Sequence, residues 1–270
     1  MARAASSVAR KGFRRFFPRL QDPILDAPLT LGDREVRVEE AYLNALSADP
    51  DPADFRRSRF REGLRWEGVV RALAPRLPKW TLDVGGGNGA VELALNARGM
   101  RTVSVEYEWN DEFVRIRESA GVPLLRVIAR AEALPFRAEV FEGIVCLETV
   151  EHLSELEAAS RELARASSPG ALLLITTPVR LRYLLAPDPH FGIRGLVALP
   201  ASLQRAVAAR RGFSAAHYYV DRIYGSVASL ERRLPGFELV QVLSRSRAPR
   251  RWYWDAIVFV RRDEPVGRSR

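Results

Sequence analysis

The chain has 270 residues, of which 47% are hydrophobic and 28% charged, as is typical of a globular protein with a sizeable core. No apolar run approaches the ~20 residues of a membrane span, and the start lacks a secretory signal, so we expect a cytoplasmic protein. The net charge of +9 lies at the ends: residues 1–20 carry six basic and no acidic groups, residues 244–270 carry eight basic and three acidic groups, and the body is left at −2. A body without excess positive charge argues against nucleic acid as a partner.

Residues 1–78 are expected to form a basic and helical N-terminal extension. Residues 1–20 interleave arginine with phenylalanine, a pattern that fits either peripheral contact with an anionic membrane or a frayed terminus. Proline-containing breaks then separate a short segment around residues 39–46 from a helix expected over residues 55–73.

From Trp80 onward, strand-like runs alternate with helix-length segments, which predicts a parallel sheet. The expected strands are residues 81–84, 101–105, 124–128, 143–147 and 171–176, and the expected helices are residues 90–98, 110–119 and 155–166. The single cysteine, Cys146, lies in the fourth of these apolar runs. It cannot form an internal disulfide, and we expect an inert core thiol.

The first expected strand runs into a glycine-rich turn, residues 85–89 (GGGNG), and then into a helix-forming segment. Glycine has no Cβ to block the approach of a ligand to the backbone, and it permits a positive φ. Glu106 follows at the ~20-residue distance where an acid can accept both ribose hydroxyls. The pattern predicts a nucleotide-cofactor site, and the glycines alone leave an NAD-dependent oxidoreductase open as an alternative.

The later motifs resemble the class I S-adenosyl-L-methionine (SAM) dependent methyltransferases. They are Asp83 before the loop, Glu106 after the second strand, residues 131–136 (AEALPF) after the third and residues 147–153 (LETVEHL) after the fourth. The likeness is to the small-molecule branch that includes the ubiquinone-biosynthesis methyltransferases. It implies an α/β, Rossmann-like class I methyltransferase fold: a mostly parallel seven-stranded sheet with helices on both faces, closed by an antiparallel pair at residues 237–244 and 252–260.

This resemblance also implies SAM as the cofactor and names the residues that hold it: Asp83, Gly85, Gly87, Gly89, Glu106, Ala131 and Glu132. Asp83 and the glycines would hold the methionine end, and Glu106 would accept the ribose. The chain departs from the family at Arg130, where an acidic residue is usual. We therefore expect the Ala131 backbone and the Glu132 side chain to flank the adenine in its place.

By the same resemblance the chain divides into further parts. Residues 79–178 are the SAM-binding core, residues 179–220 are a substrate-side cap insertion, residues 221–262 complete the core sheet and residues 263–270 form a tail. The cap is rich in proline, glycine, arginine and apolar residues, and it is expected either to line an apolar pocket or to pack over the sheet.

Glu148, Glu151 and His152 follow the fourth strand, at the edge where ligands bind in open α/β sheets. If a helix begins near Glu148, residues three and four apart share a face and the three side chains converge. Such a site suits Mg or another divalent cation. By resemblance to the small-RNA 3′-terminal 2′-O-methyltransferases, His190 would be a further ligand. The alternative is a metal-free site in which His152, beside Glu151, is the catalytic base.

The leading hypothesis is O-methylation of a hydroxylated small-molecule, sugar or lipid-linked acceptor. Residues 147–150 (LETV) stand where amino methyltransferases carry an Asn/Asp-Pro-Pro-aromatic motif, which favours oxygen as the nucleophile. An RNA 2′-O-methyltransferase is an alternative that the basic ends favour, and a non-catalytic SAM-binding module is another. The sequence identifies neither the acceptor nor the oligomeric state.

Overall fold

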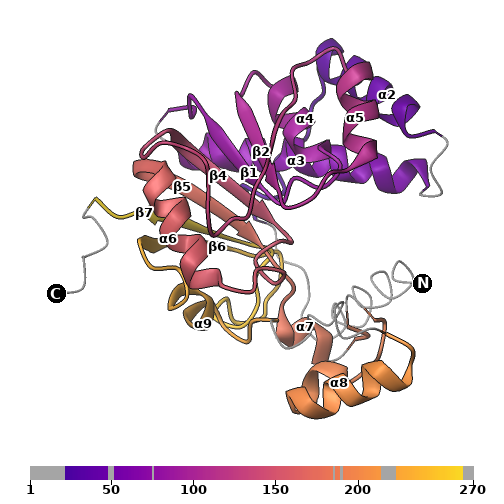
Figure 1. Ribbon diagram of the computed structural model, residues 1–270, viewed down its shortest axis with the longest axis vertical. Coiled ribbons are helices and arrows are strands. Elements are labelled where there is room, and N and C mark those ends of the chain that lie inside the picture. The colour runs from indigo at the N-terminus through magenta and orange to yellow at the C-terminus, as the bar shows by residue number, and fades with distance from the viewer. Residues whose placement is uncertain are drawn as a thin grey trace.

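The computed structural model describes residues 22–47, 52–74, 76–184, 186–188, 191–213 and 223–263. Within this part of the chain a seven-stranded sheet has the order β3-β2-β1-β4-β5-β7-β6 (Figure 1). The strands are β1 (Thr81–Val84), β2 (Thr102–Glu106), β3 (Leu125–Ile128), β4 (Phe141–Leu147), β5 (Ser167–Thr176), β6 (Phe237–Leu243) and β7 (Ala256–Arg261). Strands β1 to β5 are parallel, and β7 runs antiparallel to both β5 and β6. The expected mostly parallel seven-stranded fold is confirmed.

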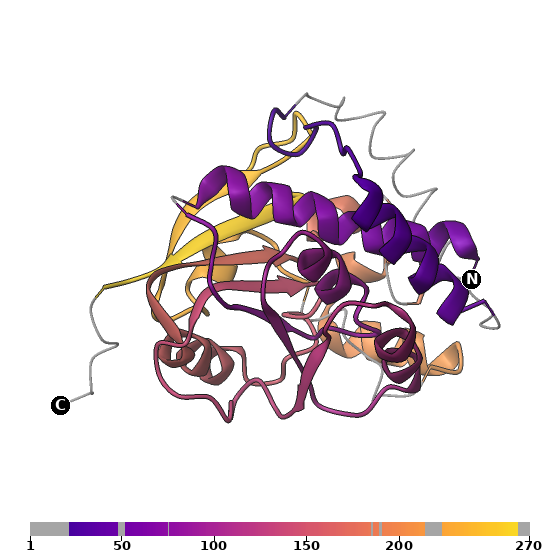
Figure 2. The same cartoon turned by 90° about the horizontal axis from the view of Figure 1, so that it is seen from above.

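Helices cover both faces of this sheet (Figure 2). They are α2 (Asp33–Ala45), α3 (Ala53–Leu73), α4 (Ala90–Ala97), α5 (Asp111–Ser119), α6 (Leu156–Ala166), α7 (Arg180–Leu184), α8 (Ala201–Arg210) and α9 (Val227–Glu231), with a 3-10 turn η1 (Leu196–Ala198). Strand β4 shows the two faces, because alternate side chains of a strand point to opposite sides. Ile144 and Cys146 pack in the cluster that includes residues of α6 and α9, whereas Val145 and Leu147 pack with residues of α3 and α4.

Most predicted elements lie within a few residues of the observed ones. Helix α5 begins where expected, because the Asn110 side chain caps it by accepting a hydrogen bond from the Phe113 N–H at 3.1 Å. The predicted strand at residues 252–260 was wrong at its start, since β7 begins only at Ala256. Residues 252–254 lie in a turn instead, where the Tyr253 N–H donates to the Pro249 carbonyl at 3.1 Å.

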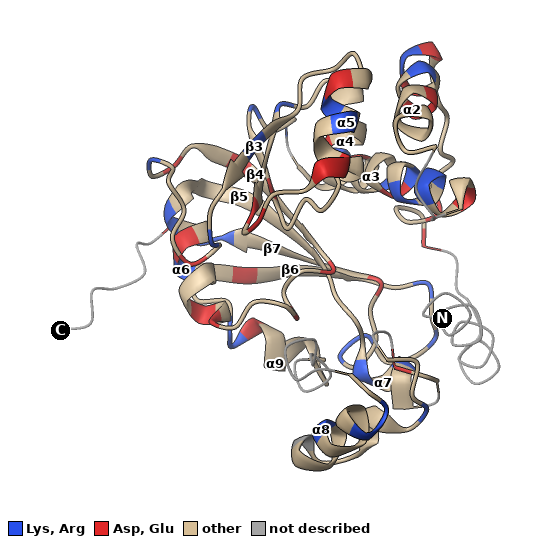
Figure 3. Cartoon of the chain, turned by 45° about the vertical axis from the view of Figure 1, so that its right-hand side comes forward, with Lys and Arg blue, Asp and Glu red and all other residues tan. Residues whose placement is uncertain are grey.

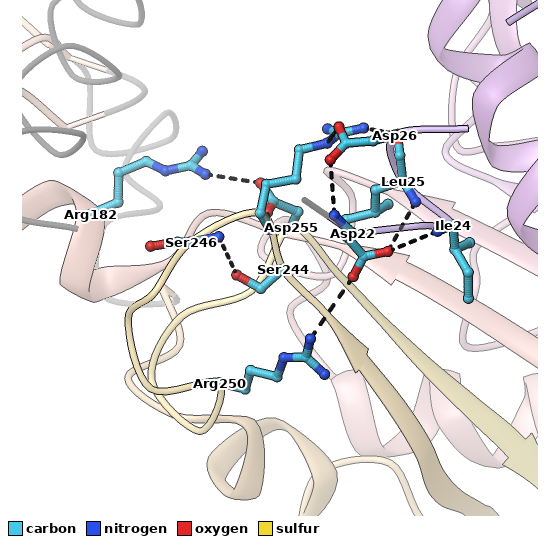
Figure 4. A network of polar contacts seen from close by, with 10 residues as sticks. Asp22, Ile24, Leu25, Asp26, Arg182, Ser244, Ser246, Arg250 and Asp255 are labelled. Carbon is cyan, nitrogen blue, oxygen red and sulfur yellow. Dashed lines mark hydrogen bonds and ion pairs between the residues drawn. The ribbon is translucent and has the colours of Figure 1, made fainter. Parts of the chain in front are cut away.

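That turn takes part in a polar network that ties the first described residues to the C-terminal part of the sheet (Figure 4). Asp26 accepts a hydrogen bond from Arg245 at 2.9 Å, and Asp22 lies 4.0 Å from the Arg250 guanidinium. On the other side, Asp255 lies 3.5 Å from Arg182 of α7. The network therefore links the N-terminal segment, the β6–β7 connection and the start of the cap.

The described part of the predicted cap has a small core of its own. Leu196, Val197, Ala208 and Ile223 form this cluster, against which Phe213 and other half-buried residues pack. Helix α8 lies away from the sheet and carries two arginines and no acidic residue (Figure 3). The basic start at residues 1–20, for which membrane contact is predicted, and His190 lie outside the described residues.

Among the described residues, no helix combines the length and the apolar character that crossing a membrane requires.

Candidate active site

The glycine loop after β1 shows two different uses of glycine. Gly85, Gly87 and Gly89 all have positive φ, at 75°, 54° and 90°, a conformation that disfavours side chains. A Cβ on Gly85 would lie 2.4 Å from the Thr149 hydroxyl oxygen, so this glycine permits close packing inside the protein. A Cβ on Gly87 would meet nothing within 4 Å. The loop therefore leaves open space above Gly87, where a ligand can approach the backbone.

Glu106 closes the other side of this space. The register pairs Val84 with Val105, so Glu106 stands one residue beyond the end of β1 and faces the loop. Its carboxylate accepts a hydrogen bond from the Gly87 N–H at 2.6 Å. The structure thus brings the glycine loop and the predicted ribose acceptor into direct contact.

Arg126 of β3 is a residue of this site that the sequence analysis missed. Its guanidinium donates to the Gly87 carbonyl at 2.7 Å and to the Ser104 hydroxyl at 3.0 Å. It also lies over the Phe113 ring, 3.7 Å from the ring centre, close enough for a cation–π interaction. The sequence signal that could have pointed to Arg126 is its position in β3, two residues before the end of this strand, which pairs with β2.

The positive charge of Arg126 affects the pKa values of two buried carboxyl groups, those of Asp83 and Glu92. Desolvation raises the pKa of Asp83 to about 7, although the positive charge of Arg126 opposes the shift. Desolvation likewise raises the pKa of Glu92 to about 8, and its carboxylate accepts a hydrogen bond from the Leu125 N–H at 2.7 Å. Atom Oδ2 of Asp83 is buried without a hydrogen-bond partner. A buried carboxylate in that state favours a cationic ligand.

The turn after β3 contains the departure from the family pattern. The Ala133 N–H donates to the Arg130 carbonyl at 3.0 Å, which fixes the turn around Ala131. The Arg130 and Glu132 side chains form an ion pair at 3.5 Å. Arg130 stands at the position that is usually acidic in the family, and its side chain points toward Glu132. Glu132 is the residue that we expect to flank the adenine in place of the usual acidic residue.

The segment after β4 does not form the predicted helix. Glu148 has a φ of 52°, which is uncommon for a residue with a side chain and ends the strand in a turn. Helix α6 begins only at Leu156. The Glu148 N–H is held by Thr176 of β5, whose carbonyl oxygen it meets at 2.9 Å. The side chains of Glu148, Glu151 and His152 were expected to converge if a helix began near Glu148, and that condition is not met. The carboxyl end of β4 has a strained backbone at Glu148 instead.

Glu151 and His152 are neighbours in this turn but differ in exposure, since Glu151 is buried and His152 is exposed. Glu151 is 1% exposed and accepts a hydrogen bond from the Thr177 hydroxyl at 3.2 Å. Burial raises its pKa well above the usual range, and the neighbouring Glu148 adds to the shift. His152 is exposed, and its Nε2 lies 3.8 Å from Oε1 of Glu151. A buried carboxyl group thus stands behind an imidazole that reaches the surface.

The described residues contain no group of three histidine, cysteine, aspartate or glutamate side chains with the arrangement of a metal site. Glu148, Glu151 and His152 are all among those residues, so they do not form such a group with one another. The fourth predicted ligand, His190, lies outside the described residues. Metal binding therefore stays a prediction.

Glu148 faces charged residues from two helices. Its side chain reaches the surface, yet enough protein surrounds the carboxyl group for desolvation to raise its pKa. Glu62 of α3 adds to the shift, whereas Arg182 of α7 and Arg59 of α3 oppose it. Helices from the N-terminal extension and from the cap thus stand near the carboxyl end of β4.

Comparison with known proteins identifies the family. Residues 82–175 match the family model described as a methyltransferase domain. This region contains the glycine loop, Glu106, Arg126 and the turn after β4. Residues 82–175 thus form a methyltransferase domain, and the sheet order is that of the class I SAM-dependent methyltransferase fold.

Solved structures are similar to this chain in fold. A protein of Pyrococcus horikoshii OT3 superposes with a TM-score of 0.54 at 16% identity, covering 81% of this chain and 95% of its own. A Thermotoga maritima SAM-dependent methyltransferase, described as a possible histamine N-methyltransferase, gives 0.49 at 17% identity, covering 83% and 100%. A Haemonchus contortus phosphoethanolamine N-methyltransferase in complex with SAM gives 0.46 at 15%, covering 75% and 42%. No curated protein matches the sequence significantly.

In this methyltransferase the sheet order reverses between β1 and β4. The carboxyl ends of the strands at such a switch point form the ligand-binding edge of open α/β sheets. The glycine loop after β1 and the Glu148 turn after β4 lie on its two sides.

Proposed function

We propose that this methyltransferase transfers the methyl group of SAM to a hydroxyl oxygen of a small-molecule, sugar or lipid-linked acceptor, with His152 as the base. The observation that carries the proposal is the exposed imidazole of His152 at the carboxyl end of β4, backed by buried Glu151 at 3.8 Å. A hydroxyl must lose its proton on methylation, so a base at this edge serves oxygen chemistry. The sequence after β4 supports the same choice, because it lacks the motif of amino methyltransferases.

The proposed cofactor residues are those named from the sequence: Asp83, Gly85, Gly87, Gly89, Glu106, Ala131 and Glu132. SAM supplies an electrophilic methyl group on a positively charged sulfur. The unpaired Oδ2 of Asp83 suits the positively charged end of such a ligand, and the open space above Gly87 admits it next to the backbone. The contact of Glu106 with the loop supports its proposed role as the acceptor of the ribose hydroxyls.

In the proposed reaction His152 takes the acceptor proton as the oxygen attacks the methyl group. Glu151 acts as a positioning residue, since its carboxyl group is fixed by Thr177 and faces the imidazole. A proton on His152 would favour the ionised form of Glu151, because opposite charges at this distance attract. Most of the rate gain is expected from holding acceptor and SAM in line.

The proposed reaction is written without a metal, because the described residues contain no group of three histidine, cysteine, aspartate or glutamate side chains that could hold one. A site completed by His190 is a separate proposal with its own test. If the cation is required, excess chelator should abolish turnover while SAM affinity is unchanged. Full turnover in chelator would reject the metal and leave His152 as a base.

The base is tested with His152→Asn. Turnover should fall by about 10²- to 10⁴-fold, the range for loss of a general base, while calorimetric SAM affinity stays within twofold, roughly 0.4 kcal/mol. Glu155→Gln, on an exposed residue three positions along the chain, is the matched control and should retain activity. Full turnover by His152→Asn would contradict the assignment.

The acceptor class is tested with SAM that carries a deuterated methyl group and a pool of cellular metabolites. Mass spectrometry of the products should find the label on oxygen. A label found only on nitrogen or carbon would overturn the proposed chemistry without affecting the assignment of the cofactor site.

A further inference from the structure

A small recess with a cavity volume of about 20 Å³ opens between the N-terminal helices and the glycine loop. The residues that line it are Tyr42 of α2, Leu46 just after that helix, Phe55, Arg56 and Arg59 of α3, Asn88 of the loop and Glu112 of α5. It is separate from the turn after β4 that carries the proposed base. Its lining combines two guanidinium groups with a phenol, an amide and one carboxylate.

Arg56 is the unusual member of this lining. The residue is 6% exposed, and its Nε and Nη1 atoms are buried without a hydrogen-bond partner among the described residues. A guanidinium group stays charged at any pH in which the protein is folded, and a buried charge without a partner carries a large free-energy cost. The side chain is therefore poised to pair with a negative group that the described part of the chain does not supply.

None of the other charged residues that line the recess is an ion-pair partner of Arg56 within the described chain. Arg59 pairs with Glu62 at 3.0 Å. Glu112, the single carboxylate of the lining, accepts a hydrogen bond from Asn88 at 3.1 Å, and no ion pair joins it to Arg56 within the described chain. Burial raises the pKa of Tyr42, so its hydroxyl keeps its proton and can donate.

We propose that this recess binds a carboxylate or phosphate group of the methyl acceptor. Arginine with a nearby hydroxyl and amide is suited to such oxyanions. All lining residues except Asn88 and Glu112 precede residue 82, where the family match begins. SAM binding is common to the family, so a site built outside the matched region serves what differs between members, the acceptor. The inference rests on the proposed function.

The experiment titrates inorganic phosphate into the full chain saturated with S-adenosylhomocysteine (SAH), at constant ionic strength, by calorimetry. Wild type should bind phosphate, and Arg56→Gln should weaken that binding by about tenfold or more. Arg57→Gln is the matched control, because Arg57 is the next residue of α3, half-exposed and paired with Asp54 at 3.2 Å. This control should bind phosphate as wild type does.

Stability gives a second readout. Removing an unpaired buried charge should leave the ligand-free Arg56→Gln protein as stable as wild type or more stable. If Asp49 or Asp51, which precede α3 in the sequence and lie outside the described residues, pairs with Arg56, the variant should instead unfold at lower temperature. That result would overturn the proposal.

The source of the anion is tested with two cofactor analogues. If the recess holds the carboxylate of SAM, Arg56→Gln should weaken SAH but not 5′-methylthioadenosine, which lacks that carboxylate, and this would overturn the acceptor site. Equal SAH affinity in both proteins with lost phosphate binding supports it. If wild type binds SAH but no phosphate, the recess is not an anion site and the proposed function is unaffected. If wild type does not bind SAH, the proposed function is wrong.

Discussion

Replacement of Arg126 by methionine should weaken both the fold and the cofactor site. The substitution removes a charged hydrogen bond to the Gly87 carbonyl, a hydrogen bond to Ser104 and a cation–π contact with Phe113. Each hydrogen bond from a charged group contributes about 1.5 to 3 kcal/mol, and a cation–π contact contributes about 0.5 to 2 kcal/mol. Together the two hydrogen bonds and the ring contact predict a free energy of unfolding lower by about 3.5 to 8 kcal/mol.

The same substitution should reduce SAM affinity by roughly ten- to a hundredfold, about 1.4 to 2.8 kcal/mol, because the loop loses the group that fixes the Gly87 carbonyl. The positive charge of Arg126 also lowers the pKa of Asp83. Its loss should therefore move the midpoint of the pH dependence of SAM binding above about 7. Calorimetry over a range of pH measures both effects, and urea denaturation measures the stability.

Arg101→Met is the matched control for this prediction. Arg101 is exposed and lies over the Trp80 ring at 5.8 Å, so the variant also loses a cation–π contact but leaves the loop untouched. Its stability should change by less than about 1 kcal/mol. If Arg126→Met bound SAM like this control, with an unshifted pH dependence, the assigned role of Arg126 would be wrong.

The remaining predictions concern pH and the buried thiol. The folded protein holds protons on Asp83 and Glu92 up to about pH 7 and 8, whereas the unfolded chain releases them near pH 4. The free energy of unfolding of the ligand-free protein should therefore fall as the pH rises from about 4 to 8, and urea denaturation showing the opposite slope would count against these pKa values. SAM affinity should rise over the same interval, because ionised Asp83 favours the cationic cofactor, and calorimetry at pH 6 and 8 checks the sign. Cys146 is fully buried, which raises the pKa of its thiol, so native protein should not react with a thiol reagent until it is unfolded.

Much of the cofactor side could be predicted from the sequence because it depends on local pattern. An apolar run followed by glycines is a short-range signal, and the structure has a strand, a glycine turn and a helix at these positions. Glu106 contacts this turn at Gly87, whereas its role as ribose acceptor stays a prediction. The mostly parallel seven-stranded sheet followed from the alternation of strands and helices together with the resemblance. The helices expected at residues 90–98, 110–119 and 155–166 begin within one residue of α4, α5 and α6.

The acceptor side was less accessible, because it depends on contacts between distant segments. The spacing of Glu148, Glu151 and His152 suggested one helical face, but a positive φ at Glu148 starts a turn that no residue type announces. Arg126 lies in an ordinary strand, and its role appears only once β3 stands beside β2 and the loop. The unpaired state of Arg56 likewise depends on how α2, α3 and the loop pack together.

The central claim, that the glycine loop holds SAM, is tested most directly by calorimetry of SAH with Gly87→Ala and Gly121→Ala. Both glycines have positive φ, at 54° and 65°, and a Cβ on either would meet nothing within 4 Å. The backbone strain of the two variants should thus be similar, about 1 to 2 kcal/mol. They differ because Gly87 faces the proposed cofactor space and Gly121 follows α5.

Wild type should bind SAH with micromolar affinity, Gly121→Ala should bind equally well, and Gly87→Ala should lose at least about tenfold in affinity, or ~1.4 kcal/mol. Equal SAH affinity in all three proteins, or binding of NADH in place of SAH, would contradict the account.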